Sequence, residues 1–129
     1  MLRNGRAVLV VSPILALLAA CSSLGEGAGG EPTLTAQQTQ GKRLFDQYCE
    51  TCHARSTDAV VMGPSLAGIE ETAAERVDGM SARAYIRQSI TDPSAYVVDG
   101  FDELMPTTLQ ETLSEEELDA LVAYLLTLE

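Results

Sequence analysis

The side chains with the clearest chemical potential lie together in the run Cys49-Glu50-Thr51-Cys52-His53. A Cys-x-x-Cys-His run is typical of covalent haem attachment: the two thiols add to the haem vinyl groups, and the histidine ligates the iron. His53 is the only histidine in the chain. The motif therefore predicts one haem c, bound covalently by Cys49 and Cys52, with His53 as its proximal ligand.

Two other kinds of site can be built from the same side chains. A thioredoxin-like redox dithiol would follow a β-strand within a βαβ unit, whereas a helical pattern precedes Cys49. A zinc site needs four ligands, so acidic residues would have to complete the set of two cysteines and one histidine. Both alternatives are weaker than haem attachment on this sequence, and the motif alone leaves them open.

A helix leads into the motif. Thr35 and Gln38 have the spacing of a capping box, which satisfies backbone N–H groups at a helix start. Apolar and small residues then recur at helical spacing, at Gly41, Leu44, Phe45 and Tyr48. Glycine inside a helix costs about 1 kcal/mol relative to alanine, and close approach of a second helix at Gly41 would explain its presence.

Two more helices are indicated farther along the chain. One begins near Ser81 and ends before Pro93, because the residue that precedes a proline avoids the helical region. Ser114 and Glu117 form a second capping box. The helix that it opens has a strong apolar face, made of Leu118, Leu121, Val122, Leu125 and Leu128. No segment alternates with a period of two, so we predict an all-α domain of three to four helices with long loops.

The chain is short and strongly acidic. It has 129 residues, with 8 Lys and Arg against 19 Asp and Glu, and a formal net charge of −11. Because it has no basic face, nucleic acid is excluded as a partner, and redox partners with basic docking surfaces are favoured. A domain of about 95 residues with two Phe, four Tyr and no Trp has a thin core, which a bound porphyrin would fill.

The N-terminus has the pattern of a secretion signal. Arg3 and Arg6 precede an apolar run of 14 residues, 7–20, which is shorter than the roughly 20 residues of a membrane-spanning helix. The run ends in Leu18-Ala19-Ala20-Cys21, which resembles the cleavage and acylation site of bacterial lipoproteins. The resemblance implies a lipid on Cys21; an uncleaved short anchor with an idle Cys21 is the alternative.

The predicted domain organisation follows from these boundaries. Residues 1–20 are the signal peptide, 21–35 are the lipidated cysteine and a flexible linker rich in Gly and Ser, and 36–129 are the haem domain. Two or more acyl chains anchor a protein stably without crossing the bilayer. We therefore expect an extracytoplasmic domain, in the periplasm or at the outer face of the cytoplasmic membrane, tethered to the membrane by its lipid.

Residues 36–129 resemble a class I cytochrome c. The matching positions are Gly41, Phe45 and Cys49 in the first helix, Gly63, Pro64 and Leu66 after the motif, and Leu121 and Tyr124 in the last helix. The resemblance implies the cytochrome c fold around one haem c, with Gly41 admitting the helix that carries Tyr124. It also implies that the Pro64 carbonyl accepts a hydrogen bond from the His53 ring, which orients the ligand.

A methionine is the expected second axial ligand, and Met/His ligation raises the haem potential. Met105 lies in the irregular stretch between the last two helices, and Leu104-Met105-Pro106 matches the ligand loop of the family. Met80 and Met62 are alternatives, although Met62 is on the loop that serves the proximal side. With His53 and Met105 both bound, the iron has no free position for a substrate, which favours electron transfer over catalysis.

The segment 85–106 narrows the resemblance. It is similar to the cytochrome c domain attached to subunit II of some haem–copper oxidases, and to small tethered monohaem cytochromes of bacterial respiratory complexes. The implied function is single-electron transfer between respiratory or photosynthetic redox partners. A fixed subunit of a larger quinol-oxidising or terminal oxidase complex is the alternative, and a haem enzyme or gas sensor without the Met105 bond is a third. Tyr96 is the candidate for the role that a tryptophan near a haem propionate has in many class I cytochromes.

Overall fold

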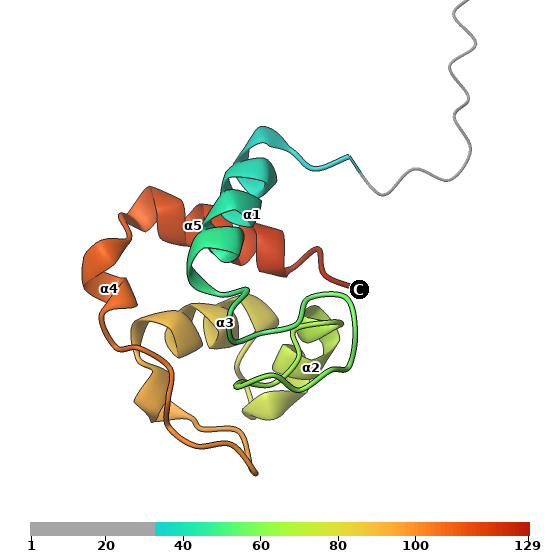
Figure 1. Cartoon of the computed structure of the whole chain (residues 1–129), viewed down its shortest axis with the longest axis vertical. Coiled ribbons are helices and arrows are strands. Elements are labelled where there is room, and N and C mark those ends of the chain that lie inside the picture. The colour runs from blue at the N-terminus through green and yellow to red at the C-terminus, as the bar shows by residue number, and fades with distance from the viewer. Residues whose placement is uncertain (1–32) are drawn as a thin grey trace, which may run out of the picture. The chain divides into compact units, whose positions relative to one another are not determined.

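The computed structural model describes residues 33–129, and its regular elements are helices (Figure 1). They are α1 (Ala36–Tyr48), α2 (Ile69–Arg76), α3 (Ala82–Thr91), the 3₁₀ helix η1 (Pro93–Ala95), α4 (Leu109–Thr112) and α5 (Glu115–Leu125). No strand occurs within 33–129, so the all-α prediction is confirmed, although there are five α-helices rather than three to four. Among these helices none is long and apolar enough to cross a membrane. The predicted signal peptide, Cys21 and most of the linker lie outside the described residues.

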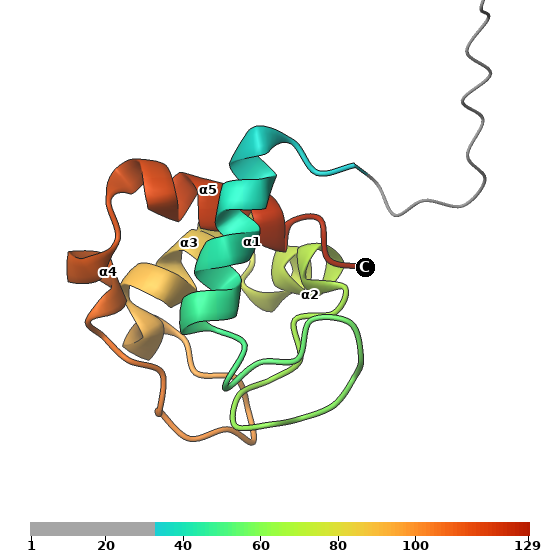
Figure 2. The same ribbon diagram turned by 45° about the horizontal axis from the view of Figure 1, so that its top comes forward.

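Helices α1 and α5 cross in the most extensive helix–helix contact of the domain (Figures 1 and 2). At the crossing, a Cβ atom on Gly41 would run into the carbonyl group of Ala120, 2.6 Å from its carbon, and would lie 2.7 Å from Tyr124 Cβ. Only glycine fits there, which confirms that Gly41 admits the helix carrying Tyr124. Next to it the fully buried ring of Phe45 packs edge to face on Tyr124, with 5.8 Å between the centroids.

Both predicted capping boxes are present. The Thr35 hydroxyl accepts a hydrogen bond from the Gln38 N–H at 3.2 Å, and the Gln38 side chain accepts one from the Thr35 N–H at 2.8 Å. At α5, Ser114 and Glu117 pair in the same way, with Glu117 Oε2 2.9 Å from the Ser114 nitrogen. Hydrogen bonds from the Ser114 backbone N–H and hydroxyl keep the pKa of Glu117 below its usual range. Helices α1 and α5 therefore begin where the sequence predicts.

The other predicted helix limits are partly right. The Ser81 hydroxyl caps α3 by accepting from the Ala84 N–H at 3.3 Å, and α3 ends before Pro93. Helix α5 ends at Leu125, three residues before the last leucine of the apolar pattern that predicts it. Leu128, assigned to its face from spacing, lies beyond the helix and packs half-buried against the core.

The short elements α2, α4 and η1 have no clear signal in the sequence. Helix α2 follows Gly68, whose φ of 61° is left-handed, and no side chain caps it. Its charges do suit the helix dipole, with Glu70 and Glu71 in the first turn and Arg76 in the last. It packs against α3 and reaches the buried core through Ile69. Packing rather than capping therefore stabilises its eight residues.

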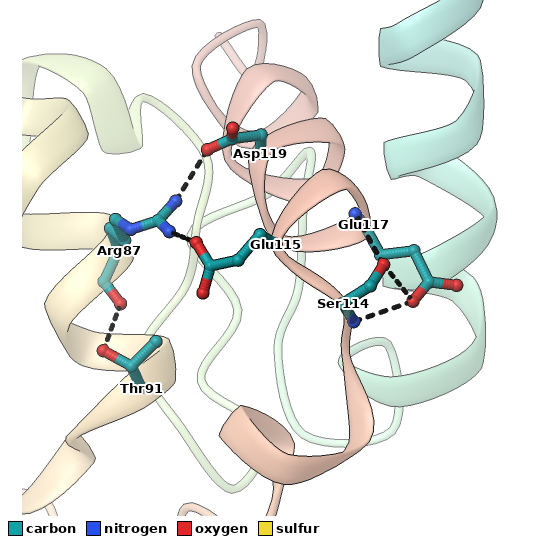
Figure 3. A network of polar contacts seen from close by, with 6 residues as sticks. All are labelled: Arg87, Thr91, Ser114, Glu115, Glu117 and Asp119. Carbon is teal, nitrogen blue, oxygen red and sulfur yellow. Dashed lines mark hydrogen bonds and ion pairs between the residues drawn. The ribbon is translucent and has the colours of Figure 1, made fainter.

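An ion-pair network joins α3 to α5 (Figure 3). Arg87 donates to Asp119 Oδ1 at 2.6 Å and to the Glu115 carboxylate, both on the first turns of α5. Within α3, the Arg87 carbonyl accepts from the Thr91 hydroxyl at 3.1 Å. The Arg87 side chain is 36% exposed, and ion pairs with that exposure contribute roughly 0.2–1 kcal/mol each. The network adds specificity to the docking of α3 more than it adds stability.

Candidate functional site

The Cys49–His53 motif forms a tight turn at the end of α1. Cys49 caps the helix, and its N–H donates to the Phe45 carbonyl at 2.8 Å. The N–H groups of Cys52 and His53 both donate to the Cys49 carbonyl at 3.0 Å. Because of this turn, both cysteines and the histidine line the wall of a single cavity.

The loop after the motif fixes the orientation of the His53 ring. His53 Nδ1 lies 2.7 Å from the Pro64 carbonyl oxygen. Because a carbonyl can only accept, Nδ1 carries the proton of this bond, and Nε2 keeps its lone pair for a metal. A Cβ atom on Gly63 would lie 2.9 Å from Nδ1 and closer still to Cε1. Glycine is therefore needed for the loop to pass this close to the ring, a requirement that the sequence shows only as a Gly-Pro loop signal.

The two thiols lie in an environment that does not favour reversible redox chemistry. Cys49 is buried, and its burial, with a smaller effect of Cys52, raises the pKa of its thiol to about 11. A redox-active dithiol needs a thiolate near neutral pH and a preceding strand, so these features argue against the thioredoxin-like alternative. Across residues 33–129, no group of three or more His, Cys, Asp and Glu side chains is placed to hold a metal ion. That argues against the zinc alternative.

A large apolar cavity opens beside the motif. It contains about 1310 Å³ of space free of protein atoms, including the part at its open mouth. Its walls come from the motif, the loop 62–66, helices α2 and α3, and the loop 96–106, which runs along the bottom of Figure 2. Many lining side chains are apolar, among them Ile69, Ile86, Ile90, Leu109 and Leu125. Arg76, at the end of α2, is the one Lys or Arg among the lining residues.

The three candidate methionines occupy different places. Met105 lines the cavity and packs half-buried against the core. Met62 also lines the cavity, but on the side of the motif, with its Sδ 3.8 Å from Cys52 Sγ. Met80 packs against the core and is not among the residues that line the cavity. Of the three, Met105 alone combines a place on the cavity wall with a chain segment distant from His53.

Two contacts hold the segment that leads to Met105. The Ser94 hydroxyl donates to the Glu103 carboxylate, which closes the loop between η1 and Met105. The rings of Tyr85 and Tyr96 pack edge to face with 5.7 Å between their centroids, and both tyrosines line the cavity. Tyr96, the candidate substitute for a tryptophan, is therefore on the cavity wall.

Arg55 ties the motif loop back to α1, a contact that sequence reasoning misses. Its guanidinium pairs with Asp46, lies 4.0 Å from a Glu50 carboxylate oxygen, and is 5.7 Å from the centroid of the Phe45 ring. Lys42 donates to Asp46 at 2.7 Å. This bond, with the bond from Arg55, keeps the pKa of Asp46 below its usual value despite some desolvation. No spacing rule pairs residue 55 with α1, because the chain reverses direction between them.

The donor set of the cavity fits a covalently bound haem. Cys49 and Cys52 supply two thiols for thioether bonds. His53 supplies Nε2 as a ligand, because the ring proton is on Nδ1 in the hydrogen bond to Pro64. Met105 supplies a thioether from another wall of the same cavity. These residues would hold the porphyrin in an apolar interior and ligate its iron on both sides.

Comparison with known proteins defines the extent of this domain. A family model described as "Cytochrome C oxidase, cbb3-type, subunit III" matches residues 36–125. The match begins at the first residue of α1 and ends at the last residue of α5, so it covers every helix and all the cavity-lining residues. No curated protein matches the chain.

Proposed function

The chain belongs to the family of cbb3-type cytochrome c oxidase subunit III, and from this premise we propose that it is a membrane-tethered monohaem cytochrome carrying single electrons between respiratory redox partners. Its domain binds one haem c covalently and serves electron transfer. Bound haem supplies the redox chemistry, because its iron alternates between the ferric and ferrous states. The residues of the chain attach the group, orient its ligands and exclude water from its apolar side.

One observation carries the proposal: His53 and Met105 line the same cavity, so both side chains would be available to ligate the iron of a bound haem. His53 is oriented by the Pro64 carbonyl at 2.7 Å, and Met105 lines the same cavity from a distant part of the chain. With both bound, no coordination position would be left for a substrate. Such a site would suit a carrier, in which electron transfer makes and breaks no bond to iron, better than a haem enzyme.

The absorption spectra of the purified holoprotein, ferric and ferrous, with and without carbon monoxide, test this proposal. We expect six-coordinate spectra in both states and no binding of carbon monoxide at neutral pH. Met105→Ala should open a position and bind carbon monoxide, whereas Met80→Ala, which is not on the cavity wall, should not. Ready binding by the wild type would favour the haem enzyme or gas sensor and overturn the proposal.

A lipid on Cys21 is the proposed tether, supported by the sequence pattern at the N-terminus. The apolar run 7–20 ends in two alanines directly before this cysteine, and c-type haem is attached outside the cytoplasm. The tether would hold the domain in the periplasm or at the outer face of the cytoplasmic membrane. Mass spectrometry of the detergent-extracted protein should find Cys21 as the first residue, with the mass of added acyl chains. An unmodified N-terminus upstream of Cys21 would contradict the tether.

A fixed subunit of a terminal oxidase complex is the second candidate function, and the description of the matching family favours it. The haem chemistry is the same in both cases, and the difference is whether the chain leaves the complex. In either case the balance of 8 basic to 19 acidic residues favours partners with basic docking surfaces. After mild detergent extraction, native sizing should find a carrier alone and a subunit together with larger chains.

A further inference from the structure

The loop between α1 and α2, residues 49–68, reverses direction before it enters α2 (Figure 2). At its base, the Cys52 carbonyl accepts a hydrogen bond from the Gly63 N–H at 2.9 Å. Directly after the motif, the Ala54 carbonyl accepts one from the Leu66 N–H at 2.8 Å. The returning half of the loop, 63–67, is therefore held beside the haem motif by backbone hydrogen bonds.

One side chain on the returning half bonds in two directions. The Ser65 hydroxyl donates to the Thr57 carbonyl at 2.6 Å and accepts from the Ala67 N–H at 3.1 Å. Within residues 33–129, its bond to Thr57 is the one hydrogen bond that joins the outer part of the loop, 56–61, to the rest of the protein. Ser65 therefore links the outer part of the loop to the returning half.

The position of Ser65 makes this link relevant to the iron ligand. Ser65 directly follows Pro64, whose carbonyl oxygen lies 2.7 Å from His53 Nδ1. That oxygen belongs to the planar peptide group that joins Pro64 to Ser65. Proline has no backbone N–H, so Pro64 itself cannot donate a bond that would hold the loop. Rotation about the Pro64 Cα–C bond would turn the carbonyl away from His53, and the bonded hydroxyl of Ser65 opposes that rotation.

We propose that Ser65 is a positioning residue for the proximal ligand: its hydroxyl holds the Pro64 carbonyl on His53 and thereby tunes how strongly His53 binds iron. The inference deepens the proposed function and rests on ligation of the haem iron by His53. A carbonyl that accepts from Nδ1 makes Nε2 a more basic ligand. A more basic ligand favours the ferric state, which has the higher positive charge, so this hydrogen bond lowers the midpoint potential.

The midpoint potential of the holoprotein measures the effect. In Ser65→Ala the loop loses its cross-link, the hydrogen bond from His53 to Pro64 weakens, and the ferric state is stabilised less. We expect the equilibrium constant for reduction to rise about threefold, which is about 28 mV for one electron at roughly 59 mV per tenfold change. Ser65→Thr keeps a hydroxyl at the same position and should return the potential towards the wild-type value.

Ser56→Ala is the matched control, because it makes the same substitution in the outer part of the same loop. Ser56 is exposed, and its side chain takes no part in the hydrogen bonds that hold residues 56–67. We expect this variant to have the midpoint potential of the wild type.

Exchange of the His53 Nδ1 proton with deuterated solvent separates positioning from general stability. Nuclear magnetic resonance of the ferrous holoprotein follows this proton directly, and the melting temperature is measured alongside. We expect exchange to be about tenfold faster in Ser65→Ala than in the wild type or in Ser56→Ala, because the carbonyl leaves the proton more often. A merely structural role would lower the melting temperature and leave the midpoint potential unchanged.

The outcomes separate the role of Ser65 from the function on which it rests. An unchanged potential with unchanged exchange in Ser65→Ala overturns the proposal, even if the variant melts at a lower temperature. Equal shifts in Ser65→Ala and Ser56→Ala also overturn it, since the effect would then belong to the loop as a whole. Ready binding of carbon monoxide by the wild type overturns the carrier function instead, and the potentials of the three variants still test Ser65.

Discussion

The α1–α5 crossing and the haem cavity are neighbouring regions that depend on opposite properties. At the crossing the chain leaves no space: Gly41 lies against the Ala120 carbonyl, and Phe45 has no exposed surface. The cavity, in contrast, is an open space that apolar side chains line on several sides. The crossing is complete as protein, whereas the cavity is complete only with its haem.

This difference bears on which helices depend on the haem for their packing. Helices α1 and α5 have capping boxes and a tight mutual contact. Helices α2 and α4 have neither, and α2 and α3 form walls of the cavity. Isolated helices of this length are marginal in water. We therefore expect the cavity side of the domain to depend on haem far more than the crossing does.

The largest expected effect comes from Cys49→Ser combined with Cys52→Ser. The haem would lose both covalent bonds to the protein. Without a bound haem, the apolar side chains of the cavity would lose the group that they pack against. We expect no haem to survive acidic acetone extraction, and thermal melting followed by circular dichroism to lose its single cooperative transition. A variant that melts at the temperature of the wild-type holoprotein would show that the cavity does not need its group.

Gly41→Val tests the crossing instead. A side chain there meets the Ala120 carbonyl and Tyr124 Cβ at 2.7 Å or less, and overpacking of this kind costs about 3 kcal/mol or more. For a domain of this size we expect the melting temperature to fall by roughly 12–24 °C. Gln37→Ala, on the exposed side of the same helix, is the control and should melt like the wild type. The midpoint potential of the folded fraction should change little, because the change lies outside the cavity.

Met105→Ala tests the cavity without removing the haem. Loss of a thioether ligand should lower the midpoint potential on the order of 0.1 V, or about 2.3 kcal/mol for one electron. Separate redox titrations of Met105→Ala, Met80→Ala and the wild type measure this shift in the midpoint potential. Met80 is off the cavity wall, so its replacement should lower stability and leave the potential near the wild-type value. The reverse result would assign the ligand to Met80.

The smallest expected effect is that of Arg87→Gln, which cuts the link between α3 and α5 shown in Figure 3. Both ion pairs are exposed, so the free energy of unfolding should fall by less than about 1 kcal/mol. Urea unfolding measures the free energy of unfolding of the variant and of the wild type at low ionic strength and at 0.5 M salt. The difference between the two proteins should be smaller at the higher salt. A loss that is large and independent of salt would mean that Arg87 acts through packing.

Local signals in the sequence predict the crossing well. Thr35 and Ser114 cap α1 and α5 through their own hydroxyl groups, and such bonds involve only a few neighbouring residues. Gly41 also gives a local signal. Glycine lowers the stability of a helix interior, so its presence there indicates that a second helix packs closely against it. Helix ends and one packing contact could thus be inferred without the structure.

The cavity side is less predictable, because its contacts join residues far apart in the chain. Helix α2 has no cap, and its existence depends on packing against α3. The Arg55–Asp46 pair and the approach of Gly63 to His53 depend on how the loops fold back. The placement of Pro64 and Met105 was accessible only through resemblance to a family, which carries long-range information that periodicity lacks. Their roles as ligand partner and ligand stay predictions until the variants are measured.

Helix α1 has a further consequence for a tethered protein. Its 13 residues, at 1.5 Å per residue, hold Thr35 and Cys49 about 20 Å apart. The described chain enters at the top of Figure 1, and the motif lies at the other end of the helix. The proposed lipid on Cys21 would therefore hold the chain at one end of this helix, with the haem motif at the other end. Adding whole turns at the N-terminal end of α1 would increase that separation in steps of about 5.4 Å.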